Sequence, residues 1–406
     1  MASTGSVSGP HPFRHGGGRR DAGRLLWWAV DSAPGPWIRT ADQLLDLVDV
    51  LSGCRAIGID TEADSLHHYT EQVCLIQLTA FGGDSWLVDP LALRDLAPLA
   101  PIFADGTVLK VLHGGDNDVT SLRRDFGFSF RTLFDTSIAA RLLGDTEVGL
   151  QALVRNELGV ELSKSSQRDD WSRRPLSPKQ EAYALADVQH LMALASRLTD
   201  RLAAAGRTAW AREEFEALAN LAPVEKRTGA DGFRRIKGSA KLARRNQAVL
   251  RELYVWREER AFAADRPPFK IVAAEALLAL AAAPPATVDD VADALASYSR
   301  LGGEVEVVFA AIQRGLALPE DQLPDRDHGE RPSVSAAARR RVEALRAWRG
   351  DQAVRSQLEA SIVMPQRLVE RLADAGPRTL EELAAVEGLR RWRVAEWGPA
   401  LLAACA

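Results

Sequence analysis

The sequence predicts an α/β domain, with a mixed sheet flanked by helices, followed by two small all-α domains. Three observations favour this arrangement. Short apolar, β-branched runs alternate with helical patterns within about residues 37–205. The chain then becomes helical, and the part beyond about residue 242 matches itself at an offset of 92 positions. A chain of 406 residues, 46% of them hydrophobic, is long enough for several domains.

Four strands and three helices are expected in the first part of the α/β domain. The runs that predict strands are Arg55–Asp60, Val73–Thr79, Trp86–Val88 and Val108–His113. The helical patterns that alternate with them are Ala41–Leu51, Leu91–Phe103 and Asp118–Phe126. Such alternation is typical of helices packed on a sheet.

The pattern turns helical over residues 136–221. Gly144 and Gly159 are expected to end helices there, and a long helix is expected over Pro178–Leu202, with its proline in the first turn. Residues 206–241 are interpreted as a helical and basic linker.

Basic residues are concentrated at the end of this linker. Residues 226–245 include one acid, Asp231, and eight basic residues: Lys226, Arg227, Arg234, Arg235, Lys237, Lys241, Arg244 and Arg245. The stretch could contact phosphates, or it could be a solvated linker that its charges keep extended. The sequence leaves both alternatives open.

The self-match predicts two copies of one small helical domain. The matched pairs are Trp256 with Trp348, Pro285 with Pro377, Thr287 with Thr379, and Val291 with Leu383. The pairs Ile271-Val272 and Ile362-Val363 fall one residue out of register, which implies a deletion. The copies are expected at about 242–320 and 337–406, with a polar linker at 321–336.

The rest of the composition points to a cytoplasmic protein. Residues 1–36 are read as a disordered tail and lead-in, without the pattern of a secretory leader. No apolar stretch approaches the roughly 20 residues that a membrane span requires. The three cysteines form neither an even disulfide set nor a metal-binding spacing, and the net charge of −4 excludes no partner.

Two carboxylates follow the first expected strand. Asp60 and Glu62 stand at positions i and i+2, so they would project from the same face of the strand. The same tripeptide recurs as Asp145-Thr146-Glu147, after Gly144 and between helices, where we interpret it as a loop or a helix cap. Position in the fold, and not the tripeptide itself, makes the first copy a candidate metal site.

Two further segments could add to that site. Asp118 follows a strand and a Gly-Gly turn at the start of a helix, with Asp116 as a nearby alternative; either could instead be a simple helix cap. Tyr183 and Asp187 lie one turn apart on one helical face. Together, four carboxylates and a tyrosine suit hydrolysis of a phosphodiester with two divalent metal ions.

At these residues the sequence resembles the DEDD superfamily of 3′→5′ exonucleases, in the tyrosine-bearing branch that includes ribonuclease D. Asp60 with Glu62, Asp118, and Tyr183 with Asp187 fit its three motifs. The segments "FDTSIAARLLG" from Phe134 and "LSKSSQRDDWSRRPLSPKQ" from Leu162 also resemble it, and the helical repeat is similar to the HRDC domain. The resemblance implies that residues 37–205 form an RNase H-like exonuclease domain before two HRDC-like domains.

The same resemblance implies a function. It would be a 3′→5′ exoribonuclease that trims RNA with a free 3′ end, precursor tRNA above all, with two Mg²⁺ or Mn²⁺ ions. Asp60, Glu62, Asp118 and Asp187 would hold the metal, and Tyr183 would position the attacking water. A 3′→5′ DNA exonuclease of the same superfamily and a non-catalytic RNA-binding protein are the alternatives.

Residues outside the three motifs are further candidates for substrate contact. The RNA 3′ end could be bound through phosphate contacts and stacking by four residues before the third motif: Lys164, Arg168, Trp171 and Arg173. Trp171 could equally belong to the core. Gln77 is expected to be a satisfied buried amide, His67-His68 to lie in a loop, and Val386–Gly398 to approach a phosphate backbone.

Overall fold

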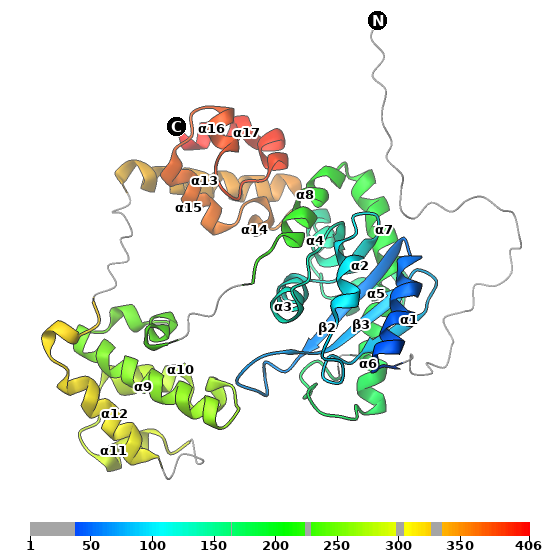
Figure 1. Ribbon diagram of the computed structural model, residues 1–406. Coiled ribbons are helices and arrows are strands. Elements are labelled where there is room, and N and C mark those ends of the chain that lie inside the picture. Colours follow the sequence, from blue (N-terminus) through cyan, green and yellow to red (C-terminus); the bar gives the residue numbers. More distant parts are fainter. Residues whose placement is uncertain (1–36, 164, 224–228, 298–303, 326–334) are drawn as a thin grey trace, which may run out of the picture. The chain divides into compact units, whose positions relative to one another are not determined.

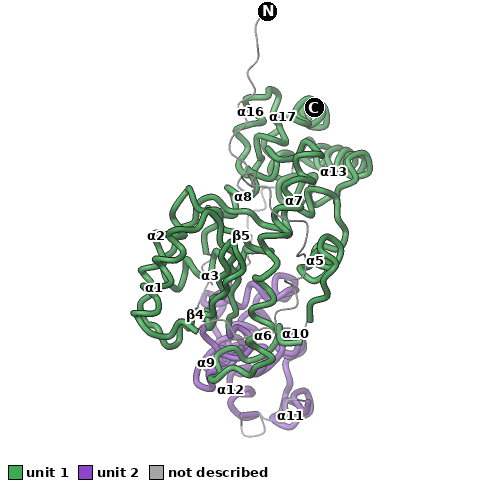
Figure 2. The backbone as a smooth tube through the Cα atoms, turned by 90° about the vertical axis from the view of Figure 1, so that its right-hand side faces the viewer, with its two compact units in different colours: residues 1–63, 73–223, 335–406 green, residues 64–72, 224–334 purple. Residues whose placement is uncertain are grey.

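The structure is a computed structural model that describes residues 37–163, 165–223, 229–297, 304–325 and 335–406 (Figure 1). The expected tail at 1–36 therefore lies outside the described residues. The chain forms two compact units (Figure 2). Unit 1 contains residues up to 63, 73–223 and 335–406, and unit 2 contains 64–72 and 224–334. The domain boundaries expected from the sequence stay a prediction.

Unit 1 contains a mixed sheet, as the sequence predicts, and this sheet has six strands. Its strands are β1 (Trp37–Ile38), β2 (Ala56–Ala63), β3 (Val73–Ala80), β4 (Ser85–Val88), β5 (Leu109–Leu112) and β6 (Leu133–Asp135). They lie in the order β1-β4-β3-β2-β5-β6. β3 runs antiparallel to β2 and β4, whereas the pairs β2–β5, β5–β6 and β1–β4 are parallel.

The four expected strands are all present, and two more were missed. β1 and β6 have only two and three residues, too few for an alternating pattern to stand out. β2 continues three residues beyond Asp60, through the tripeptide itself. The two acidic side chains are therefore held by sheet hydrogen bonds and not by a loose strand end.

Among the described residues before 220, eight α-helices accompany the sheet. They are α1 (Ala41–Ser52), α2 (Ala100–Ala104), α3 (Asp116–Phe126), α4 (Thr136–Leu143), α5 (Leu150–Leu158), α6 (Pro178–Gln189), α7 (Leu191–Ala204) and α8 (Thr208–Ala219). The helix expected over Leu91–Phe103 was wrong: only a 3₁₀ turn at Ala97–Leu99 and the short α2 form. Pro98 and Pro101 remove backbone donors there. The expected long helix divides at His190 into α6 and α7.

Helices α6 and α7 are fixed closely to β2. α6 packs against β2, β3 and β4, while α7 packs against β2 and β5. A Cβ atom at Gly58 in β2 would lie 3.3 Å from Leu191 and 2.6 Å from Thr79, so this close approach requires glycine. A capping box of Ser177 and Gln180 begins α6. These contacts set the distance between the acidic strand and the helix that carries the third motif.

The two repeats are all-α, as predicted. The first forms α9 (Arg244–Ala263), α10 (Ala274–Ala282), α11 (Val288–Ala294) and α12 (Val305–Ala317) in unit 2. The second forms α13 (Ala336–Ser356), α14 (Ala360–Val363), α15 (Gln366–Ala375), α16 (Leu380–Ala384) and α17 (Arg391–Cys405) in unit 1. Trp256 is buried in its repeat, consistent with a packing residue.

The register between the repeats corrects one expectation. Arg257 donates to the Val272 carbonyl at 3.5 Å, and Arg349 donates to the Met364 carbonyl at 3.2 Å, fifteen residues later in both cases. Val272 therefore corresponds to Met364, and no deletion separates the copies before this point. Thr287 and its match both cap the next helix.

Residues 64–72 connect β2 to β3 but belong to unit 2. His68 Nδ1 lies 2.7 Å from Asp265 Oδ2, and the Tyr69 ring packs edge-on against Phe262 with centroids 5.5 Å apart. The loop predicted for His67-His68 is confirmed.

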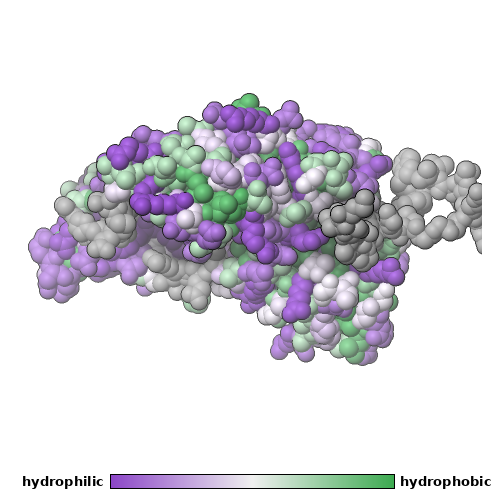
Figure 3. All heavy atoms as spheres, turned by 90° about the horizontal axis from the view of Figure 1, so that it is seen from above, coloured by the Kyte–Doolittle hydropathy of each residue, from purple (hydrophilic) through white to green (hydrophobic). Residues whose placement is uncertain are grey.

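Hydrophilic residues predominate on the face drawn in Figure 3, with hydrophobic residues in small groups. Among the described residues, no helix combines the length and apolar character needed to cross a membrane.

Candidate active site

Three carboxylates converge where β2 meets α6. Asp60 and Glu62 project from one face of β2, and Asp187 reaches the same place from α6. One oxygen from each carboxylate lies within 4.8 Å of those of the other two. Among the described residues this is the group whose spacing suits a metal ion. Sequence separation between Asp60 and Asp187 exceeds a hundred residues, so the fold creates the cluster.

Asp118 lies beside this cluster at the start of α3. The Thr61 hydroxyl donates to Asp118 Oδ1 at 2.5 Å. Asp118 is buried and its charge acts on both carboxylates of β2. The alternative, Asp116, is exposed in the first turn of α3. Burial is the main cause that raises its pKa, and the acid that raises it further is Asp135, which is not one of the three converging carboxylates. The geometry thus favours Asp118 as the fourth carboxylate.

The pKa values of all four carboxyl groups are raised. Burial raises the pKa of Asp60 well above its usual range, and the charges of Asp118 and Asp187 raise it further. Burial, followed by the charges of Asp187 and Asp118, raises the pKa of Glu62 to about 9. Burial raises the pKa of Asp118 and that of Asp187 to about 6. These groups repel one another when ionised, and a bound cation would remove that repulsion.

Tyr183 completes the group of five residues predicted from the sequence. Its hydroxyl donates to the Asp187 carboxylate one helical turn later. Burial, followed by the charge of Asp187, raises the pKa of Tyr183, so the phenol stays protonated at neutral pH. Its ring lies against Trp171, with centroids 6.0 Å apart.

The four expected substrate contacts have different outcomes. Trp171 is only 1% exposed and belongs to the core under Tyr183, so it offers no face on which a base could stack. The core alternative is confirmed. Arg173 is exposed and pairs with Asp170 at 3.1 Å. Arg168 is exposed, and Lys164 lies outside the described residues.

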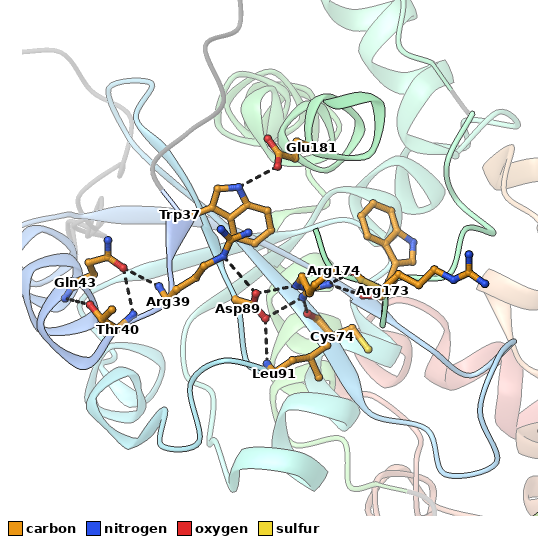
Figure 4. Close-up of polar contacts among 11 residues, drawn as sticks. Trp37, Arg39, Thr40, Gln43, Cys74, Asp89, Leu91, Arg173, Arg174 and Glu181 are labelled. Atoms are coloured by element: carbon orange, nitrogen blue, oxygen red, sulfur yellow. Dashed lines mark hydrogen bonds and ion pairs between the residues drawn. The ribbon is translucent and has the colours of Figure 1, made fainter. Parts of the chain in front are cut away.

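Arg174 is a structural residue that the sequence reasoning missed. Its guanidinium donates to both Asp89 oxygens at 2.8 and 2.9 Å, to the Cys74 carbonyl at 2.6 Å, and to the Trp171 carbonyl at 2.8 Å (Figure 4). Although burial opposes it, Arg174 holds the pKa of Asp89 below its usual value.

A second contact attaches α6 to the edge of the sheet. Trp37 Nε1 in β1 donates to Glu181 Oε1 at 3.1 Å, and Arg39 lies over the Trp37 ring at 3.9 Å (Figure 4). Arg174 holds the segment that precedes α6, and the Trp37–Glu181 hydrogen bond holds the first turn of α6. The position of Asp187 therefore depends on residues far from the metal ligands.

Gln77 departs from its predicted state. It is fully buried, as expected, yet neither its Oε1 nor its Nε2 has a hydrogen-bond partner among the described residues. The prediction of a satisfied amide was wrong. Its position in β3, directly opposite Asp60, places this amide beside the acidic group.

Three arginines of the basic stretch form hydrogen bonds within unit 2, whereas Arg235, Lys237 and Lys241 are exposed. In the basic stretch, Arg244 and Arg245 donate to carbonyls in the last turn of α12 and just after it, and Arg234 donates to the Asp325 carbonyl. Lys226 and Arg227 lie outside the described residues. These arginines act as caps and not as free cations.

The segment Val386–Gly398 contacts α8 within unit 1. Arg393 donates to Glu214 of α8 at 2.7 Å, and Trp392 Nε1 donates to the same carboxylate at 3.1 Å. The Trp392 ring stacks on Trp210, with centroids 4.3 Å apart. The expectation that this segment approaches a phosphate backbone was wrong for these side chains.

Comparison with known families and structures gives consistent matches. The 3'-5' exonuclease family matches residues 36–203, and the HRDC domain family matches residues 246–296 and 338–405. Ribonuclease D of Desulfotalea psychrophila is 31% identical over 288 residues, which cover 71% of this chain and 77% of that relative.

Longer matches cover nearly the whole chain. Ribonuclease D of Xanthomonas oryzae pv. oryzae is 33% identical over 365 residues, covering 88% of this chain and 94% of the relative. The crystal structure of Escherichia coli RNase D superposes with a TM-score of 0.68 at 28% identity, covering 91% of this chain and 98% of that one. The matches thus include both the catalytic part and the helical repeats.

Proposed function

The chain belongs to the ribonuclease D family of 3′→5′ exoribonucleases, and we propose that it hydrolyses RNA from the 3′ end at the acidic site of β2 and α6. The observation that carries this proposal is the convergence of Asp60, Glu62 and Asp187 within 4.8 Å, with Asp118 beside them. No other described group of acidic, histidine or cysteine side chains has this spacing.

Family membership implies the use of divalent metal ions, and the residues fit such ions. The donor set consists only of carboxylate oxygens, which suit hard cations such as Mg²⁺ or Mn²⁺. The raised pKa values of Asp60 and Glu62 fit as well, since mutual repulsion is what bound cations relieve. We propose two ions, held by Asp60, Glu62, Asp118 and Asp187.

Bound at this site, such ions lower the pKa of water and stabilise negative charge on a phosphodiester. The protein's own contribution is positioning. Because the Tyr183 hydroxyl donates a hydrogen bond to Asp187, its oxygen has lone pairs left to accept a hydrogen bond from the attacking water. Its raised pKa makes Tyr183 an orienting group and not a general base near neutral pH.

We propose precursors of structured RNA as substrates, tRNA 3′ ends above all. The support is the match to Escherichia coli RNase D, which is described as an exoribonuclease involved in structured RNA processing. We also place the activity in the cytoplasm, where such precursors are made in bacteria. Arg168 and Arg173, both exposed just before α6, are the proposed contacts to substrate phosphates.

The direct test uses 5′-labelled single-stranded RNA and the matched DNA, with Mg²⁺ or Mn²⁺ and with EDTA. The proposal predicts a ladder that shortens one nucleotide at a time, faster on RNA, and absent with EDTA or with Asp60→Asn. Faster shortening of DNA would favour the DNA exonuclease alternative. Metal-independent binding of RNA without any product would favour the non-catalytic alternative.

A further inference from the structure

Gln77 is a buried polar residue that has no role in the proposed mechanism. It stands in the middle of β3, pairs directly with Asp60 of β2, and is 0% exposed. Side chains of directly opposed residues in antiparallel strands lie on the same face, with Cβ atoms about 4.5–5.5 Å apart. The Gln77 amide and the Asp60 carboxylate are therefore neighbours on the α6 side of the sheet.

An unpaired buried amide is unfavourable, and few native side chains remain in that state. The other neighbours of Gln77 on this face do not offer it a hydrogen bond. Leu87, opposite it in β4, is apolar. The Thr79 hydroxyl already donates to the Asp84 carbonyl at 3.1 Å and accepts from Ser85 at 3.0 Å. Asp60 is the polar side chain that lies directly opposite Gln77 in the neighbouring strand.

Other unpaired polar atoms of unit 1 lie near the same helix. Among its described residues, the buried side-chain atoms without a partner belong to Gln77, Ser166 and Trp171. Ser166 and Trp171 lie in the segment that leads into α6, and Trp171 packs against Tyr183. Among the described residues of unit 1, the unpaired buried side-chain atoms therefore lie in β3, beside Asp60, and in the segment before α6, the helix that carries Tyr183 and Asp187.

We propose that Gln77 is a positioning residue for Asp60, and that its Nε2 donates a hydrogen bond to the Asp60 carboxylate when that carboxylate is ionised and holds metal. This inference rests on the proposed function, since it assigns Asp60 as a metal ligand. The bond would fix one oxygen of Asp60 and leave the other for the cation. It would also give the buried amide the partner that it otherwise lacks.

The proposal predicts two effects of opposite sign for Gln77→Met, which keeps most of the side-chain volume. Removing an unpaired amide should leave the metal-free fold as stable as before or more stable. Losing the donor to Asp60 should weaken metal binding. A purely structural glutamine would behave in the reverse way, because its replacement would lower metal-free stability without changing metal affinity.

The experiment titrates the metal-free full-length chain with MnCl₂ by calorimetry and measures its melting temperature in EDTA. For Gln77→Met we expect Mn²⁺ affinity weaker by about tenfold or more, equivalent to about 1.4 kcal/mol, with an unchanged or higher melting temperature. Gln247→Met is the matched control: Gln247 is also buried with an unpaired Oε1, but it lies in unit 2 and its Nε2 donates to the Leu242 carbonyl at 3.1 Å. Its Mn²⁺ affinity should equal that of the wild type.

Wild-type affinity in Gln77→Met, or a lowered metal-free melting temperature, would overturn the proposal. The wild type and Asp60→Asn separate this failure from that of the proposed function. If the wild type binds Mn²⁺, Asp60→Asn does not, and Gln77→Met binds normally, only the role of Gln77 is wrong. If the wild type itself binds no Mn²⁺, the metal site and this inference fail together.

Discussion

The chain contains the tripeptide Asp-Thr-Glu twice, and the two copies have different surroundings. In Asp60-Thr61-Glu62 the acidic side chains lie in a strand, and burial and other acids raise their pKa values. In Asp145-Thr146-Glu147 they lie in the loop between α4 and α5. There Asp145 pairs with Arg201 at 2.7 Å and Glu147 pairs with Arg155 at 3.2 Å.

The difference shows how the fold selects one copy for chemistry. Arginines pair with both carboxylates of the second tripeptide, and these pairs connect the loop to α7 through Asp145 and to α5 through Glu147. The first tripeptide instead meets Asp187 and Asp118, which add negative charge and favour a cation. The tripeptide is identical in both places, so the proposed catalytic role depends on the sheet and on α6.

The largest expected difference between the copies is in activity. Asp60→Asn removes a proposed metal ligand and should lower the rate of RNA hydrolysis by about a thousandfold or more. Asp145→Asn makes the same chemical change in the loop and should leave the rate within about twofold, since no proposed ligand is altered. Single-turnover rates on one labelled RNA measure both. Comparable losses in the two variants would contradict the distinction.

The free energy of unfolding should fall more when Arg174, before α6, is replaced than when Arg201, beside the second tripeptide, is replaced. Arg174→Met leaves Asp89 buried at 3% exposure without its main partner, and such losses cost about 3–5 kcal/mol. Arg201→Met breaks two more exposed pairs, with Asp145 and with Glu157, each worth about 1 kcal/mol or less. Urea denaturation of each variant gives the two values. Equal costs would mean that Arg174 does not hold the segment before α6.

The glutamates of the two tripeptides should differ in their effect on pH dependence. The folded-state pKa of Glu62, about 9, lies above its unfolded value, so its contribution to stability is present at low pH and is lost as pH rises through about 9. In EDTA the wild type should therefore lose several degrees of melting temperature relative to Glu62→Gln between about pH 5 and pH 9. Glu147→Gln should follow the wild type throughout. A constant difference between Glu62→Gln and the wild type would refute the raised pKa.

The smallest expected effect concerns metal-free stability. At pH 8 in EDTA, Asp145→Asn should lower the free energy of unfolding by about 0.5–1 kcal/mol, because an ion pair with Arg201 is lost. Asp60→Asn should raise it slightly, because repulsion within the acidic group is relieved. Thermal melts of both variants test the signs. A stabilised Asp145→Asn would show that the loop pair contributes nothing.

The five proposed catalytic residues were predictable because their motifs are local. Spacings of two and four residues place side chains on one face of a strand or a helix, and strand–turn–helix patterns placed Asp118. Arg174 was not predictable in this way. Its partner Asp89 is 85 residues away, and a local pattern carries no sign of such a pair.

The repeats illustrate the same limit on a larger scale. Their helical fold and their match at 92 positions were visible in the sequence, because packing residues recur. The docking of Arg393 and Trp392 onto Glu214 was not, since charged and aromatic side chains in a helix-rich segment resemble a nucleic-acid contact equally well. The first repeat has Leu301 and Arg300 at the matched positions, so the two copies differ in sequence where the second one docks.

Anomalous diffraction from crystals grown with Mn²⁺ tests the central claim most directly, since it locates the metal without reference to activity. The account predicts anomalous peaks bounded by Asp60, Glu62, Asp118 and Asp187, and their loss in Asp60→Asn. A wild-type crystal at saturating Mn²⁺ with no peak among these carboxylates, or with its peak beside Asp145, would contradict it.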